Sequence, residues 1–158
     1  MRVRIKESIK LKRIYVCMTF LWIIFIFSFS LQPGDVSSQI SSGFGQWLIQ
    51  TLLPFAKDFL EENWGVVHLI IRKGAHFTEY LVLGILMRST LHQYAHRLPT
   101  RLGGVSWLMC VVVASCDETI QRYVGGRAGQ VMDVLLDARG ALVGIVLLSL
   151  CINRRKKR

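Results

Sequence analysis

The segment RKGAHFTEY interrupts an otherwise apolar stretch of the chain with residues that could do chemistry. Arg72, His76 and Glu79 are spaced by four and then three residues, which places them on one face of an α-helix. Lys73 and Tyr80 lie beside them, seven residues apart. A charge at the centre of a membrane span costs about 3 kcal/mol or more, so such side chains face partners or water. The segment therefore predicts a polar stripe that faces other helices.

Two later segments carry polar groups that match this stripe. SCDETIQRYVGGR contains Asp117, Glu118 and Gln121 at helical spacings of three and four residues. QVMDVLLDARGALVG contains Asp133 and Asp137, again four residues apart, followed by glycines on the same helical face. Small residues let helices approach closely. We therefore expect three helices to contribute polar residues to one site.

The histidine and the acids allow two kinds of chemistry. A buried histidine beside a carboxylate can titrate near neutral pH and act as a general acid or base. The same groups could instead bind a divalent metal ion that engages a phosphate or activates water. The residues considered for these catalytic roles are His76, Glu79, Asp117, Glu118 and Asp133. Whether a metal cofactor is present stays open, because the basic residues nearby compete for the same carboxylates in a structural ion-pair network.

The basic residues are suited to an anionic ligand. Arginine offers a bidentate fork for phosphate or carboxylate, and lysine offers a point charge. The candidate substrate-binding residues are Arg72, Lys73, Tyr80, Gln121, Arg127 and Asp137. Glycines on both sides of Arg127 indicate either a loop that closes over a ligand or an ordinary tight turn.

The composition of the whole chain is apolar and basic at once, with 52% hydrophobic residues and a net charge of +10. Nucleic-acid-binding proteins spread Lys and Arg over a face, whereas more than half of the twenty basic residues here lie in residues 1–13 and 153–158. Basic ends of this kind are typical of the cytoplasmic flanks of membrane spans. We therefore predict an all-α integral membrane protein with two basic cytoplasmic termini and no nucleic-acid partner.

Four apolar segments position the polar residues. The predicted spans cover residues of about 14–31, 66–87, 102–123 and 133–152. A cleaved signal peptide is the rival interpretation of the first span, although its apolar region exceeds the usual length of about 7 to 15 residues. The loop at 32–63 is acidic, and the segment HQYAHRLPTR is basic, so the positive-inside rule places all three polar segments at the outer face. We predict a bundle of about four transmembrane helices within a membrane domain at 14–152, with a polar pocket that opens outward.

The first outer loop contains two different kinds of sequence. LQPGDVSSQISSG is rich in Pro, Gly and Ser and predicts irregular chain. GQWLIQTLLPFAKDFLEENW mixes aromatic, aliphatic and polar residues. It indicates either a short helix lying in the membrane interface, broken near Pro54, or a plain loop.

The four cysteines lie in apolar stretches and have no CxxC spacing. A zinc site or a disulfide framework would require closer or more regular spacing. We expect all four to be buried free thiols, because free cysteine behaves as a small hydrophobic residue.

Three motifs in this order, RKGAHFTEY, DETIQ and GGRAGQVMDVLLDARGALVG, resemble those of the VanZ-like membrane proteins, and the FSLQPG turn fits as well. The resemblance covers residues of about 31–148. Positions that match the family pattern are Arg72, Lys73, His76, Phe77, Glu79, Tyr80, Asp117, Glu118, Gln121, Arg127, Asp133, Gly140 and Gly144. Asp137 stands where the pattern commonly has Asn, which adds a potential negative charge. The resemblance implies a multi-pass protein of the bacterial cell membrane, and the namesake of the family is associated with resistance to teicoplanin-type glycopeptide antibiotics.

Two functions of different class are consistent with these observations. The first is an envelope protein that binds or modifies a lipid or a lipid-linked anionic precursor in the bilayer, and that thereby alters glycopeptide susceptibility, as the resemblance implies. The second is a non-enzymatic membrane subunit or a small transporter-like protein, in which the charges form a structural or ion-conducting network. Whether the protein is an enzyme stays open, because no nucleotide-binding loop or serine-hydrolase motif is present in the sequence.

Overall fold

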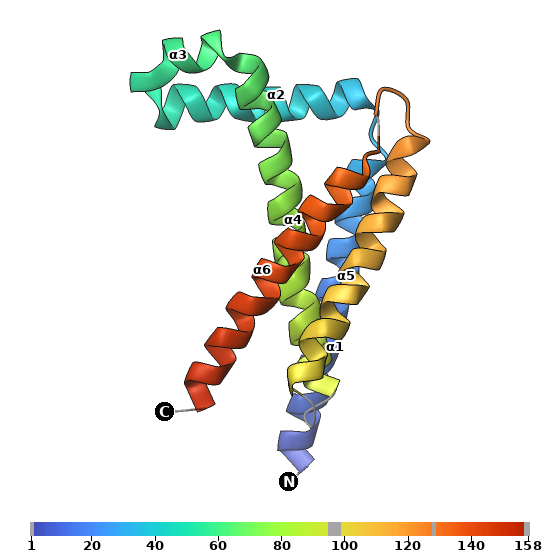
Figure 1. Cartoon of the computed structure of the whole chain (residues 1–158). Coiled ribbons are helices and arrows are strands. Elements are labelled where there is room, and N and C mark those ends of the chain that lie inside the picture. Colours follow the sequence, from blue (N-terminus) through green and yellow to red (C-terminus); the bar gives the residue numbers. More distant parts are fainter. Residues whose placement is uncertain (1, 95–98, 128, 157–158) are drawn as a thin grey trace.

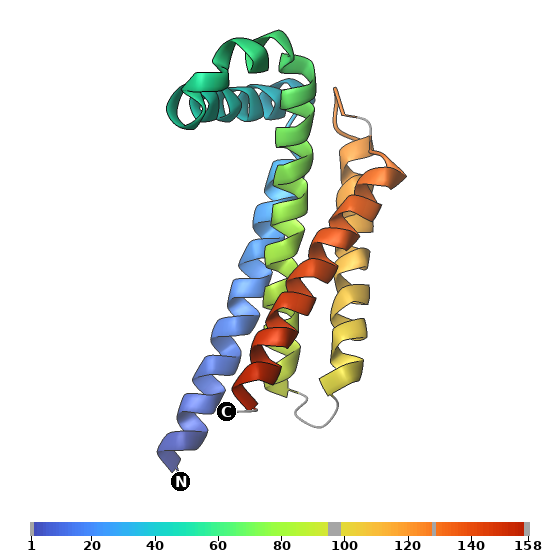
Figure 2. The ribbon, with the colours of Figure 1, turned by 60° about the vertical axis from the view of Figure 1, so that its left-hand side comes forward.

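The computed structural model describes residues 2–94, 99–127 and 129–156, and every regular element within these ranges is a helix. In chain order the elements are α1 Arg2–Ser30, α2 Gly34–Leu52, the 3-10 helix η1 Pro54–Ala56, α3 Lys57–Glu62, α4 Trp64–Tyr94, α5 Pro99–Arg122 and α6 Val131–Lys156. The four long helices form a bundle, and α2 and α3 lie across one end of it (Figure 1). Both termini lie at the opposite end (Figures 1 and 2). The predicted all-α class is confirmed.

Helix α4 is the centre of the bundle, since it packs against α1, α5 and α6 and also against α2. The buried core between these helices consists of Ile26, Tyr80, Leu83, Met87, Cys110, Ala114 and Ala141. A side chain at Gly140 would overlap the carbonyl group of Phe77, and one at Gly144 would overlap that of Leu81. The expected close approach of helices at these two glycines is therefore confirmed, and it brings the middle of α6 against the middle of α4.

Three helices carry a segment that is long and apolar enough to cross a membrane, among the residues the structure describes. These segments are Ile9–Ser30 in α1, Arg101–Arg122 in α5 and Val131–Ile152 in α6. Helix α4 runs alongside them in both views (Figures 1 and 2). At 31 residues it has ample length, but it is not among the three helices that are apolar enough, and it carries the polar segment RKGAHFTEY. The predicted count of about four spans therefore stays a prediction for α4.

The prediction of irregular chain at the start of the first outer loop holds for residues 31–33 and is wrong from Gly34 onward, because α2 begins there and continues for 19 residues. Pro33 precedes this helix with φ −52° and ψ 149°, an extended conformation that suits the residue before a first turn. Asp35 in the first turn interacts favourably with the helix dipole. The helix ends before Pro54, which disfavours the helical conformation of Leu53, as expected from a break at this proline.

The start of α2 is held against the turn between α5 and α6. The backbone N–H of Gly34 donates a hydrogen bond to the carbonyl of Gly125 over 3.0 Å. A side chain at Gly34 would overlap the carbonyl of Gly126, and Gly126 itself has φ 77°, a conformation that favours glycine. The glycines before α2 and after α5 therefore allow the two backbones to approach closely. This favours an ordinary tight turn around Arg127 over a loop that closes on a ligand.

The expectation that all four cysteines are buried is wrong for three of them. Cys110 is fully buried in the core, whereas Cys17, Cys116 and Cys151 are exposed on the outside of their helices. An exposed thiol is tolerated there because the outer surfaces of α1, α5 and α6 are themselves apolar.

Candidate functional site

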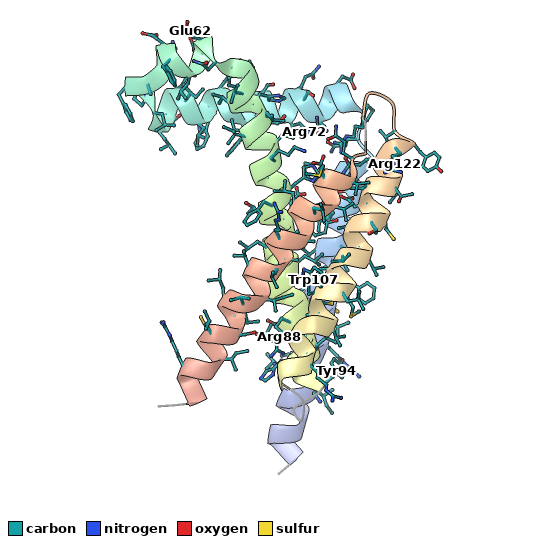
Figure 3. The ribbon with its side chains drawn as sticks, in the orientation of Figure 1. Glu62, Arg72, Arg88, Tyr94, Trp107 and Arg122 are labelled. Atoms are coloured by element: carbon teal, nitrogen blue, oxygen red, sulfur yellow. The ribbon has the colours of Figure 1, made fainter. Side chains whose placement is uncertain are left out.

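The three polar segments meet at the end of the bundle that lies next to α2. Arg72 projects from α4 and Arg122 from α5 at this end, whereas Arg88 and Tyr94 lie further along α4 toward the termini (Figure 3). The antiparallel course of α4, α5 and α6 explains the convergence, because the polar residues occupy the first half of α4, the end of α5 and the start of α6.

The carboxylate of Asp117 is held by side chains of two helices. Ser30, at the end of α1, donates a hydrogen bond to Oδ1 of Asp117. The amide of Gln121, one turn further along α5, donates to Oδ2 of Asp117 over 3.3 Å and to the Ser30 hydroxyl over 3.2 Å. All three residues are buried, so these bonds replace water around the carboxylate. Asp117 is thereby fixed in orientation toward α4 and α6.

A histidine and three acids come together between α4, α5 and α6. The cluster contains His76, Asp117, Glu118 and Asp137, and each contributes one nitrogen or oxygen that lies within 4.8 Å of the others. His76 Nδ1 lies 3.9 Å from Oδ1 of Asp137, beyond hydrogen-bond distance. Asp117 and Asp137 are completely buried, and Glu118 is 2% exposed. We refer to these four residues as the acidic cluster.

The edge of the acidic cluster is closed by two further interactions. Lys73 of α4 forms an ion pair with Asp133 in the first turn of α6. The backbone N–H of Gln130 donates a hydrogen bond to Oε2 of Glu118 over 3.0 Å. A side chain at Gly129 would overlap the backbone carbonyl of Glu118, so the chain enters α6 directly over the end of α5.

A cavity of about 610 Å³ lies on the other side of α4, between α1, α2 and α4. Its wall is largely apolar and aromatic, and includes Trp22, Phe25, Phe29, Ile40, Phe44, Ile71 and Val82. Its polar groups include Arg72, His76, Glu79 and Arg127. An apolar cavity with a few convergent polar groups is the usual form of a small-molecule site. His76 belongs to both the cavity wall and the acidic cluster, so the two features are adjacent.

The two arginines at this cavity have unused hydrogen-bonding capacity. Arg127 donates from Nη2 to the carbonyl of Phe29 over 3.0 Å, while its buried Nε has no hydrogen-bond partner. Arg72 makes no hydrogen bond or ion pair with the residues the structure describes. Burial, together with the nearby charge of Arg72, lowers the pKa of Arg127 from its ordinary value. Arginine nevertheless stays charged at neutral pH, so the pair forms a positive region at one end of an apolar cavity.

The predicted stripe on α4 is divided between these two features. Arg72 and Glu79 line the cavity, whereas Lys73 contacts α6 and Tyr80 is fully buried near Asp117 and Asp137. The predicted catalytic residue Glu79 therefore lies apart from the acidic cluster. Asp137, predicted as a substrate-binding residue, lies inside it. The assigned roles stay predictions.

Several residues of α1 belong to the site without having been predicted from the sequence. Ser30 binds Asp117, and Trp22 donates from its indole nitrogen to the backbone carbonyl of Glu79 over 2.9 Å. Phe29 accepts the bond from Arg127. Only the FSLQPG turn, which contains Phe29 and Ser30, gave a signal, because Trp22 lies in an uncharged apolar run.

The fold and the site define an all-helical protein with three helices long and apolar enough to cross a membrane, among the described residues, and with a buried polar centre. Residues 15–152 match the family model described as VanZ/LLP1. The chain therefore belongs to the VanZ/LLP1 family, a membrane-associated family, as the three motifs indicated. No curated protein sequence matches the chain, and no solved structure matches it.

Proposed function

We propose that the protein is a multi-pass protein of the bacterial cell membrane in which α1, α4, α5 and α6 all span the bilayer. The charges of α4 support this arrangement, because Lys73 and His76 face α6 and Glu79 faces a cavity rather than the outside of the bundle. With the basic termini in the cytoplasm, α2 and α3 lie at the outer interface. The exposed aromatic residues Phe44, Trp47, Phe55 and Phe59 suit a helical segment in that position.

We further propose that the cavity binds an anionic lipid or lipid-linked envelope compound. The single observation that carries this proposal is the combination of an aromatic and aliphatic wall with Arg72 and Arg127 at the same cavity. The apolar wall suits an acyl or prenyl chain. The guanidinium groups of Arg72 and Arg127 suit a phosphate or carboxylate headgroup. A change in such a compound would alter glycopeptide susceptibility, in line with the family resemblance.

A transporter-like function is the second candidate, and the packing of the core argues against it. A conduction path would need polar groups from the acidic cluster to the end of the bundle at the termini. Between these regions lies the apolar layer of Ile26, Leu83, Met87 and Ala141. We therefore favour binding, or binding followed by modification, over conduction.

A comparison of lipid and envelope extracts tests the proposal and separates an enzyme from a binding protein. Extracts are compared by mass spectrometry between cells with the wild-type protein and cells with the His76→Ala variant. Asp58→Asn, a substitution at an exposed residue of α3, serves as the control. Lipid that remains bound to each purified protein is measured in parallel, together with the amount of protein in the membrane.

We expect an anionic lipid or lipid-linked compound to be bound by the wild-type protein and by the Asp58→Asn control. A modified compound that disappears in His76→Ala cells would make the protein an enzyme. Bound but unchanged lipid would make it a binding protein. Identical extracts together with no bound lipid in any sample would contradict the proposal.

A further inference from the structure

The acidic cluster brings three buried carboxyl groups together, and the two basic side chains Lys73 and Arg127 form no ion pair with them in the described part of the chain. Three carboxyl groups and one imidazole have ligand atoms within 4.8 Å of one another. Ionised carboxylates at this separation in a buried site repel one another strongly unless protons or a cation lie between them. The question is therefore which groups supply the compensation.

The nearby basic residues are engaged elsewhere. Lys73 pairs with Asp133, outside the cluster. Arg127 attracts Asp117 and Glu118 at longer range, but its one hydrogen bond goes to the carbonyl of Phe29. In the described part of the chain, no ion pair joins either residue to a carboxylate of the cluster. Lys73 and Arg127 therefore act on the acids of the cluster only at longer range, without a direct ion pair to any of them in the described residues.

Several ligand atoms of the cluster are buried and have no hydrogen-bond partner. These are Nδ1 of His76, Oε1 of Glu118, and both Oδ1 and Oδ2 of Asp137. Asp137 is fully buried and Glu118 is 2% exposed. Carboxyl groups that shared a proton would be joined by a hydrogen bond, and no such bond connects these residues. Unpartnered buried oxygens that face a common centre are the arrangement expected of ligands to a cation.

We propose that His76, Asp117, Glu118 and Asp137 form a binding site for one divalent cation, Zn²⁺ or Mn²⁺. One imidazole nitrogen with carboxylate oxygens suits these ions, whereas Mg²⁺ and Ca²⁺ prefer oxygen ligands alone. With bonds of about 2.0 to 2.2 Å, ligand atoms lie about 3.3 to 3.6 Å apart around a tetrahedral ion and about 4.0 to 4.4 Å apart on opposite sides of an octahedral ion. Because the ligand atoms of the cluster lie within 4.8 Å of one another, the side chains would have to move closer together around the ion, by up to about 1.5 Å for the most distant pair.

The groups behind the cluster are those that orient metal ligands. Ser30 and Gln121 donate hydrogen bonds to Asp117, and the backbone N–H of Gln130 donates to Glu118. Such outer hydrogen bonds hold ligating carboxylates in position. Because His76 also lines the cavity, the ion lies beside the proposed lipid site. The cation site does not depend on the identity of the compound in that cavity.

Metal content of the purified full-length protein tests this inference. The protein in detergent micelles is stripped with a chelator, loaded with Zn²⁺ or Mn²⁺ alone, desalted, and analysed by elemental mass spectrometry. We expect about one ion per chain for the wild type and for Asp58→Asn. His76→Gln and Asp137→Asn should weaken binding at least about tenfold, since each removes a ligand or a ligand charge.

Two further measurements detect cation binding independently of the metal content. Thermal unfolding should show that the cation raises the Tm of the wild type and of Asp58→Asn but not that of Asp137→Asn. Co²⁺ loaded into the wild type should give visible ligand-field absorption, a readout that needs no variant. No ion in the wild type with either metal, or equal binding by wild type and Asp137→Asn, would overturn the inference. Bound lipid is measured in the same samples. Lipid without a cation would contradict the cation site alone, and a cation without lipid would contradict the proposed function alone.

Discussion

The hydroxyl of Ser30, the last residue of α1, donates a hydrogen bond to the carboxylate of Asp117 in α5, across 87 positions of the sequence. Ser30 is 2% exposed and Asp117 is completely buried. This bond connects the first span to the polar centre and fixes the orientation of one of its acids. An apparently unremarkable serine at the end of an apolar span is therefore part of the site.

Replacing Ser30 should destabilise the bundle. In Ser30→Ala, Asp117 loses a donor in a buried position, so we expect about 1 to 3 kcal/mol less stability. The measurement is thermal unfolding of the purified protein in detergent, with Ser28→Ala as the matched control. Ser28 is exposed, and among the described residues its hydroxyl donates a hydrogen bond only to the carbonyl of Phe25. Equal Tm values for the two variants would contradict the role given to Ser30.

The approach of α6 to α4 should depend on the absence of a side chain at Gly140. Because a Cβ there would overlap the carbonyl of Phe77, Gly140→Ala should cost about 1 to 3 kcal/mol through overpacking. Gly104→Ala in α5 is the control, since, apart from the neighbouring residues and backbone of its own helix, no atom of the described residues lies within 4 Å of the Cβ it would add. That control should be neutral or slightly stabilised, because alanine favours the helix. Unfolding curves that rank the two variants in the opposite order would rule out the close approach.

The ion pair between Lys73 and Asp133 should couple α4 to α6 energetically. The pair is only partly buried, with side-chain exposures of 35% and 16%, so its coupling should fall in the general range of about 0.5 to 3 kcal/mol. A double-mutant cycle with Lys73→Gln and Asp133→Asn, read by thermal unfolding, measures this coupling. Strictly additive effects would show that the two charges do not interact.

The proposed orientation places the α2–α3 segment and the turn before α6 outside the cell. We expect a membrane-impermeant thiol reagent, added to intact cells, to label Lys57→Cys and Gln130→Cys in a chain whose four native cysteines are replaced. Position 10 at the basic end of α1 is the control, and Lys10→Cys should react only after the cells are opened. Labelling of Lys57→Cys and Gln130→Cys from the cytoplasmic side alone would invert the orientation.

The helices could be predicted from the sequence because their signals are local. An uncharged apolar run, a helical spacing of polar residues and basic flanks each depend on a few neighbouring residues. Helix α2 was missed in its first part because Pro33, Gly34 and the serines that follow favour irregular chain in isolation. In the fold, Pro33 precedes the helix and Gly34 allows contact with Gly126, so tertiary packing explains both residues.

The convergence of the polar segments could be expected from the antiparallel order of the helices, but the division of the site could not. Whether Glu79 or Asp137 faces the acids depends on the rotation of α4 and α6, which is set by the close approach at Gly140 and Gly144. The cavity beside Arg72 depends on α2 lying across the end of the bundle. The sequence of α4 alone shows neither the rotation of the helices nor the position of α2.

The proposed lipid site is tested most directly by native mass spectrometry of the protein purified from bacterial membranes. We expect an anionic lipid or lipid-linked compound to be bound to the wild-type chain. Arg72→Gln should lose this compound because it removes a positive charge from the cavity, and it should leave the fold intact because Arg72 has no structural partner among the described residues. Val82→Trp should lose the compound because the larger side chain fills the cavity. The matched controls Arg101→Gln and Val112→Trp alter exposed side chains of α5 and should retain it. Equal retention of the compound by all five proteins, or no bound anionic compound in the wild type, would contradict the proposal that the cavity binds an anionic lipid.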